Sequence, residues 1–210
     1  LGLFLAHHRR ESPSTANRFA VRMAGLGYAI PGGVIAIGVL GPLWWFENGV
    51  NEFTERVLGW SPGLFLSGTI FAVLFGYQVR FLAIPLNVVG AGFERIRFSI
   101  DDAAKTLGTS RLRLLWSVHL PLLRGSLVCA ALMVFVDVLK ELPATLILRP
   151  FNFDTLAVRV YQLASDERLS EASTGALAII LAGLIPVVLL TRMLKSSYVS
   201  PSTSGGGAGT

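Results

Sequence analysis

The run Asp101-Asp102-Ala103-Ala104-Lys105-Thr106-Leu107-Gly108 lies between two long apolar windows, and Leu120-Pro121 follows twelve positions after its glycine. Each window is about as long as a bilayer core is thick, so the run belongs to a connection between membrane helices. Its polar residues place it at the membrane surface, and its glycine predicts a sharp turn there.

The composition indicates a membrane protein. The chain has 210 residues, of which 52% are hydrophobic and 15% charged, and its mean hydropathy is +0.61. Soluble domains carry about 25% charged residues. The net charge of +5 comes from basic residues beside the apolar windows, a pattern that encodes membrane topology and does not indicate a nucleic-acid partner. We therefore predict an all-α fold, a polytopic bundle of transmembrane helices in the lipid bilayer.

Four apolar windows are long enough to span a bilayer. They are at about residues 24–46, 62–84, 122–148 and 172–194. We expect the second to begin with Ser61 as a cap and Pro62 at the first helical position. Basic residues dominate 7–22, 85–120 and the segment after the last window, so these parts are predicted to be cytoplasmic.

The connection at 94–121 is predicted to fold as two short helices around a glycine turn. Ser99 is a candidate cap for the first helix, and Asp102 favours its N-terminal end. Gly108 ends this helix, and Ser110 caps a second one that Pro121 closes at the membrane. A small apolar face on the first helix is made by Ala103, Ala104 and Leu107.

These residues resemble the cytoplasmic coupling loop of ABC-importer permeases. The family pattern is Glu-Ala-Ala, three residues, Gly, nine residues, Ile, one residue and Leu-Pro. The matching positions here are Asp102, Ala103, Ala104, Gly108, Val118, Leu120 and Pro121. Two of them depart conservatively from the pattern, with Asp for Glu and Val for Ile.

The resemblance implies that this loop docks on a separate ATPase subunit of an ABC transporter. The chain has three lysines, none after a glycine, so it lacks the lysine of a phosphate-binding loop. Arg111 and Arg113 in a helix-turn-helix also fit a DNA-binding unit, but 35 residues or so leave no room for a third helix and a core. An ordinary loop of another membrane protein is the remaining alternative.

Three charges fall inside the third apolar window. Asp137, Lys140 and Glu141 are spaced three and four apart, so we expect them on one helical face, turned to the bundle interior and paired with each other. The cluster has one excess negative charge. It either braces the helices or lines the substrate path, and Pro143 is expected to break the helix nearby.

The string from Lys140 to Pro150, followed by Phe151 to Ala157, resembles the C-terminal half of ferric-iron-type permeases, as does Tyr28 to Gly32. The resemblance covers about residues 20–195 and implies a multi-pass protein of the bacterial inner membrane with a periplasmic iron-binding protein as donor. Thiamine or an inorganic anion is the alternative cargo. A secondary transporter driven by an ion gradient is the alternative mechanism, and a membrane-tethered regulator is a remote third.

Residues 1–195 are interpreted as one transmembrane domain and residues 196–210 as a disordered Ser/Gly-rich tail. Residues 1–6 resemble the end of an interrupted apolar segment, so we expect a chain truncated at its N-terminus. Its missing half, or a second permease copy, is a further expected partner. Cys129 is expected to be a small apolar residue, and no cofactor or metal is expected; His7, His8 and His119 have no acidic neighbours at ligand spacing.

Overall fold

The structure is a computed structural model that describes residues 1–11 and 15–198. The regular elements of those residues are all helices, which confirms the predicted all-α class. In chain order they are α1 (Gly2–Glu11), α2 (Thr15–Ala29), α3 (Gly32–Leu58), α4 (Ile70–Phe81), α5 (Ala83–Glu94), α6 (Phe98–Thr106), α7 (Arg111–Leu114), the π-helix η1 (Leu115–His119), α8 (Leu120–Leu139), α9 (Pro143–Leu148), α10 (Leu156–Ser165) and α11 (Leu169–Tyr198).

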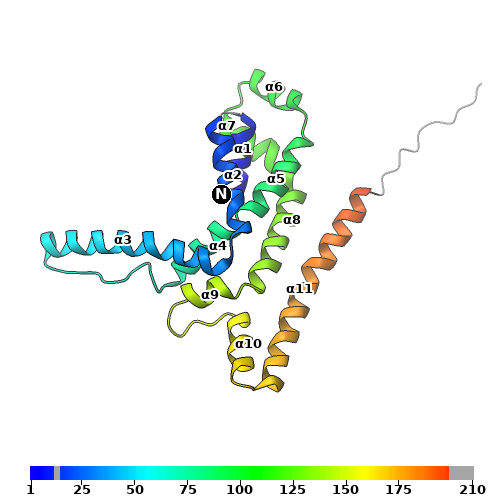
Figure 1. Cartoon of the computed structure of the whole chain (residues 1–210). Helices are drawn as coiled ribbons and strands as arrows, with labels where there is room; N and C mark the ends of the chain where they lie inside the picture. Colours follow the sequence, from blue (N-terminus) through cyan, green and yellow to red (C-terminus); the bar gives the residue numbers. More distant parts are fainter. Residues whose placement is uncertain (12–14, 199–210) are drawn as a thin grey trace, which may run out of the picture.

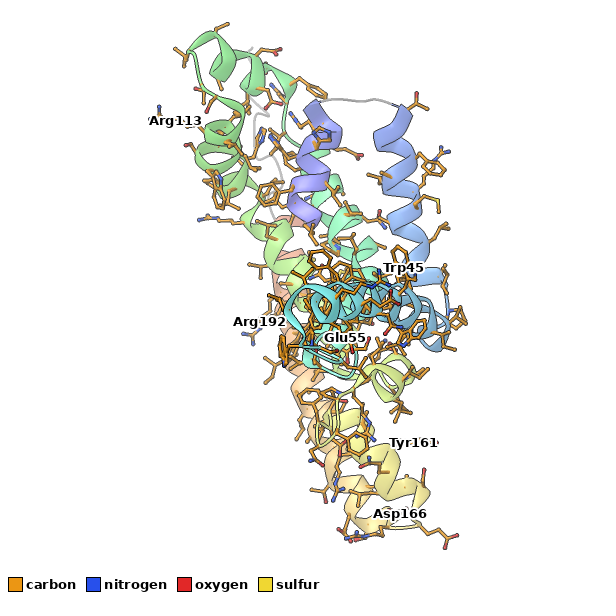
Figure 2. The ribbon with its side chains drawn as sticks, turned by 90° about the vertical axis from the view of Figure 1, so that its left-hand side faces the viewer. Trp45, Glu55, Arg113, Tyr161, Asp166 and Arg192 are labelled. Carbon is orange, nitrogen blue, oxygen red and sulfur yellow. The ribbon has the colours of Figure 1, made fainter. Side chains whose placement is uncertain are left out.

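The molecule is an elongated bundle with two distinct ends. α5 packs along α8 and α1 packs on α5, while α11 lies partly against α8 and pairs with α10 (Figure 1). α3 extends sideways from this bundle. α6 and α7 form one end, and the connection between α10 and α11 forms the other; Arg113 and Asp166 mark the two ends in Figure 2. The polar run that carries the glycine turn therefore stands at one extremity.

Two groups of buried apolar side chains hold the helices together. One group lies between α3, α4 and α9, and the other joins α1, α5, η1 and α8. The first is formed by Ile35, Ala36, Val39, Leu43, Ala72, Val73, Ala144 and Leu148. The second is formed by Ala6, Val89, Phe93, Ile96, Leu115, Leu123 and Ala130. Because the second group is adjacent to α6, it sets the position of the helices beneath that end.

Three helices of the described part are long and apolar enough to cross a membrane: Gly32–Leu58, Leu112–Leu139 and Leu169–Arg192. The pair α4 and α5, bent by 47°, adds a fourth span if it is counted as one. Pro85 explains the bend, because it lacks the N–H that would bond to the Phe81 carbonyl.

The predicted first window, 24–46, does not coincide with one helix. α2 ends at Ala29, and α3 begins directly after Pro31. The two helices are separate because a proline disfavours helical geometry at the residue before it. α3 then continues twelve residues beyond the predicted end, to Leu58. Pro42 stays inside α3 and does not end it.

The predicted helix start at Ser61 and Pro62 is wrong. Residues 59–69 are irregular, and Thr69 caps α4 instead by accepting a hydrogen bond from the N–H of Phe71 at 3.3 Å. Polar side chains of α3 satisfy the irregular backbone. The fully buried Glu47 carboxylate accepts hydrogen bonds from the N–H groups of Leu66 and Ser67. These contacts replace the bonds that a helix would have formed.

The third window, 122–148, is divided as the proline predicted. α8 ends at Leu139 and α9 begins at Pro143. The predicted stop at Pro121 is wrong, however: α7, η1 and α8 follow one another without a break, and Pro121 lies in the first turn of α8. The fourth window, 172–194, lies inside α11. α11 also includes residues 196–198, which we predicted to be disordered, while 199–210 lie outside the described residues.

Candidate functional site

The loop singled out by sequence folds as a short helix, a glycine turn and a second helix. α6 begins at Phe98, so Ser99 lies inside its first turn and not at the predicted cap position. Gly108 has φ +74°, the left-handed conformation that glycine adopts at low cost. The N–H of Thr109 donates to the carbonyl oxygen of Ala104 at 3.0 Å, which closes the end of α6.

The predicted docking residues fall into two groups in space. The tip is exposed, with Leu107 at 84% exposure, whereas Ala104 is half-buried. The exposed members of the tip are Asp102, Ala103, Leu107 and Gly108. Val118 and Leu120 are half-buried in η1 and at the start of α8, and Pro121 is exposed there. The second group therefore belongs to the long helix that carries the tip.

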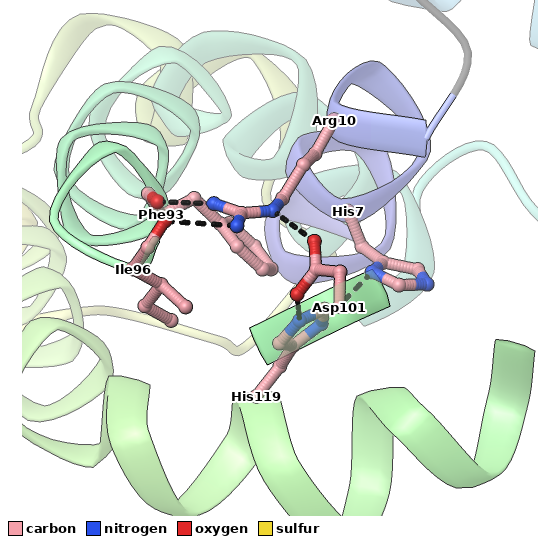
Figure 3. A network of polar contacts seen from close by, with 6 residues as sticks. All are labelled: His7, Arg10, Phe93, Ile96, Asp101 and His119. Carbon is pink, nitrogen blue, oxygen red and sulfur yellow. Dashed lines mark hydrogen bonds and ion pairs between the residues drawn. The ribbon is translucent and has the colours of Figure 1, made fainter. Parts of the chain in front are cut away.

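Beneath the tip, the side chain of Asp101 points inward, and the residue as a whole is 6% exposed (Figure 3). Its Oδ2 accepts a hydrogen bond from Nε of Arg10 at 2.7 Å, and its Oδ1 lies 2.9 Å from Nε2 of His119. Nδ1 of His119 lies 3.3 Å from Nδ1 of His7. One carboxylate thus connects α6 to α1 and to η1.

Arg10 extends the same network to α5. Its Nη2 donates to the carbonyl oxygen of Ile96 at 2.8 Å, and its Nη1 donates to that of Phe93. The guanidinium carbon also lies 4.5 Å from the centre of the Phe98 ring, within cation–π range. We call Arg10, Asp101 and His119, with these contacts, the base network.

The base network keeps Asp101 ionised. Burial favours the neutral acid, but the hydrogen bonds from His119 and Arg10, together with the Arg10 charge, outweigh it and hold the pKa of Asp101 below its usual 3.8. A carboxylate only accepts hydrogen bonds, so Nε2 of His119 is the donor. When His119 is neutral, its Nδ1 is an acceptor that faces His7.

Sequence reasoning missed the base network. It assigned a role to Asp102 and none to Asp101, and it found no acidic neighbour for the histidines. His119 and Asp101 are 18 positions apart and Arg10 is 91 positions from Asp101; the contact depends on how α1 and η1 pack. The usable signal was the charge of Asp101 in the first turn of a helix next to an apolar window.

The predicted cluster in the third window is divided in the structure. Nζ of Lys140 lies 2.9 Å from Oδ1 of Asp137, as expected for a pair, and the Tyr28 hydroxyl donates to Oδ2 of Asp137 at 3.2 Å. Glu141 does not join them. α8 ends at Leu139, so Glu141 lies beyond the helix and faces a different partner, Arg80. The prediction that all three charges share one face of a helix was therefore wrong.

Glu141 pairs with Arg80 of α4. Nε of Arg80 lies 2.9 Å from Oε2 of Glu141, although the N–H direction does not make this a hydrogen bond. Oε1 of Glu141 accepts from the N–H of Ala144 at 3.1 Å at the start of α9. Nη1 of Arg80 donates to the carbonyl oxygen of Ile30 at 2.9 Å. This ion pair ties the α2–α3 and α8–α9 breaks to α4.

Gly32 makes that approach possible. A Cβ at this position would lie 2.5 Å from Oε1 of Glu141, closer than real contacts allow, and 3.0 Å from Nη1 of Arg80, which is tighter than most contacts. Arg80 was recognisable from the sequence as an isolated charge inside the second apolar window. It also supplies the positive charge that the predicted cluster lacked.

Comparison with known proteins identifies the family. Residues 1–198 match the family described as binding-protein-dependent transport system inner membrane component. The chain is 26% identical over 171 residues to the Fe(3+)-transport system permease protein FbpB 2 of Haemophilus influenzae. The aligned region covers 81% of this chain and 31% of the relative.

Two further relatives have other names. The putative 2-aminoethylphosphonate transport system permease protein PhnV of Salmonella paratyphi A is 28% identical, over 66% of this chain and 53% of the relative. The maltodextrin transport system permease protein MalD of Streptococcus pneumoniae is 30% identical, over 60% of this chain and 46% of the relative. The chain thus spans about a third to a half of these relatives. With nearly its whole described length matched, this chain belongs to the family of binding-protein-dependent transport system inner membrane components.

Proposed function

We propose that this chain is a membrane-spanning permease subunit, or part of one, of an ATP-driven ABC importer. The observation that carries the proposal is the placement of α6. Its tip, with Ala103 and Leu107, is exposed at one end of the bundle, while Asp101 at its base is buried in contacts with α1 and η1. An exposed apolar tip on a firmly held base suits a helix that inserts into a partner's groove.

The partner proposed for this tip is an ATPase subunit. We propose that the energy comes from another chain, since the sequence contains no glycine-lysine phosphate-binding motif. α6 and the segments on either side of it carry five basic residues, namely Arg95, Arg97, Lys105, Arg111 and Arg113. These suit an acidic rim on the ATPase, and they support the proposal that this end of the bundle lies in the cytoplasm. The docking residues remain those of the sequence pattern, with Asp102, Ala103, Leu107 and Gly108 at the exposed tip.

For the cargo we propose ferric iron, delivered by a periplasmic binding protein across a bacterial inner membrane. Support comes from the string between Lys140 and Ala157 and from the relative named for Fe(3+) transport. Thiamine or an inorganic anion is the alternative cargo, and the relatives named for 2-aminoethylphosphonate and maltodextrin widen that choice. Asp137, Lys140 and Glu141, which adjoin a helix break, are proposed to line or brace the path.

The assembled importer, with its ATPase and binding protein, tests this proposal in proteoliposomes. We expect uptake of radiolabelled ferric iron that requires internal ATP and the iron-loaded binding protein. An importer whose ATPase cannot hydrolyse ATP is the control, and it should show no uptake. Iron uptake that is absent while another ligand of the binding protein is transported would reject the cargo but keep the mechanism.

A secondary transporter is the second candidate, because helix breaks with charged groups also occur in that class. The breaks at Pro31, Leu82 and Pro143 lie near the ion pair of Arg80 and Glu141. The two candidates differ in energy source. Uptake that continues after ATP depletion with the proton gradient intact favours the secondary transporter, and uptake that stops favours the ATP-driven importer.

A further inference from the structure

α6 contacts the rest of the molecule mainly through its first turn, which contains Asp101. Of the helix pairs that pack extensively, none includes α6, and the outward side chains of Phe98, Ile100 and Leu107 are exposed. Among the residues of α6 whose burial the structure describes, Asp101 is the buried one. A force applied to the docked tip therefore passes along the chain, through the carboxylate of Asp101, or through the Phe98 ring that lies against Arg10.

The partners of that carboxylate lie on the helices that would have to move. His119 is the last residue of η1, directly before α8, and it is completely buried. A π-helix places one additional residue in a turn, and such turns occur frequently at functional sites. Arg10 joins the same carboxylate to α1 and, through the carbonyl oxygens of Phe93 and Ile96, to the end of α5.

The hydrogen bonds of the base network are charge-assisted, which makes them stronger than bonds between neutral groups. Arg10 and Asp101 are an ion pair with side chains 6% and 9% exposed, and water competes little for such buried groups. Arg10 also reaches two backbone carbonyl oxygens. A connection with several directed bonds transmits rotation as well as displacement, which a single apolar contact does not.

We propose that Asp101, His119 and Arg10 form the joint through which movement of the docked α6 reaches α1, α5 and α8. This inference rests on the proposed function, in which α6 docks on an ATPase. We assign all three a positioning role, because they act through α6 and the helices that they join to it. If the joint is weakened, the tip should still dock on the ATPase, but ATP hydrolysis should become uncoupled from transport.

The test measures cargo transported per ATP hydrolysed by the complete importer in proteoliposomes. His119→Leu removes the donor to Asp101, and we expect the ratio to fall about tenfold, the effect of losing a hydrogen bond to a charged group. His119→Gln retains an N–H donor near the Nε2 position and should keep the ratio close to that of the unmodified importer. His8→Leu, at an exposed position of α1, is the matched control and should change nothing.

The outcomes separate the two proposals. Absence of ATP-dependent uptake by the unmodified importer overturns the proposed function itself. An unchanged ratio in His119→Leu, or an equal loss in His119→Gln, overturns the joint alone. If His119→Leu does not assemble with the ATPase, the same ratio of cargo transported to ATP hydrolysed is measured for Asp101→Asn. This substitution keeps the size of the side chain and one acceptor oxygen but removes the charge. A fall in that variant supports the joint, and an unchanged ratio overturns it.

Discussion

The two polar clusters of this chain, the base network under α6 and the charges at the α8–α9 break, are organised differently. In the base network one carboxylate, Asp101, gathers partners from α1 and η1, and all of its members are buried. At the break, neighbouring residues diverge. Glu141 is 5% exposed and paired with Arg80, whereas the Lys140 side chain is 66% exposed. Adjacency in sequence therefore says little about a shared environment once a helix has ended.

The difference predicts which charges stabilise the fold. A buried charge without its partner costs several kcal/mol, while an exposed pair contributes little. The base network and the Arg80–Glu141 pair should thus be sensitive to truncation. The Asp137–Lys140 pair should tolerate it, and any effect there should concern transport.

The largest effect is expected for Glu141→Ala. It leaves Arg80 without its charge partner between α4 and the breaks, at a cost of about 3–5 kcal/mol. The melting temperature of the purified protein in detergent measures this loss. Lys140→Ala is the adjacent, exposed control. Replacing the pair together, as Arg80→Met with Glu141→Leu, should recover much of the stability; equal melting temperatures for all variants would contradict the contrast between the clusters.

A second comparison uses two glycines with the same backbone strain. Gly108 has φ +74° and Gly59 has φ +67°, and a Cβ at either would meet no atom within 4 Å. Valine at either position should therefore cost about 1–2 kcal/mol from left-handed geometry alone. Both variants should melt at similarly reduced temperatures. Only Gly108→Val should lose ATPase co-purification and uptake. If uptake by Gly108→Val is unaffected, Gly108 is not needed for docking.

The base network should also respond to acid. Because the folded-state pKa of Asp101 is lowered, its carboxylate stabilises the fold above the unfolded value of 3.8, and this contribution is lost as the pH falls through the lower, folded value. The melting-temperature difference between the unmodified protein and Asp101→Asn should be present at about pH 5 and shrink as the pH falls below about 4. A difference that stays constant down to about pH 3 would contradict this assignment.

The smallest effect on stability is expected for Lys140→Ala. Its pair with Asp137 is partly exposed, so the loss should be below about 1 kcal/mol. Uptake should nevertheless fall more than the yield of assembled importer if Lys140 belongs to the path. Proportional losses of uptake and assembly would make the pair a structural brace.

The sequence predicted features that depend on neighbouring residues. The all-helical class follows from the apolar windows, the turn at Gly108 from the cost of left-handed geometry, and the break at Pro143 from the missing N–H. The bounds of the second window were wrong because Glu47, nineteen positions before Leu66, supplies hydrogen bonds that keep residues 59–69 irregular. No local pattern contains that contact.

The chain by itself determined which segments are apolar enough for a membrane, where the glycine turn lies and that the charges at 137–141 need partners. Only the tertiary structure decided who those partners are. Arg80 meets Glu141, and Arg10 meets Asp101, from 61 and 91 positions away. Propensity and periodicity act over one or two turns of helix, whereas a buried charge takes whichever opposite charge the packing of whole helices brings within reach.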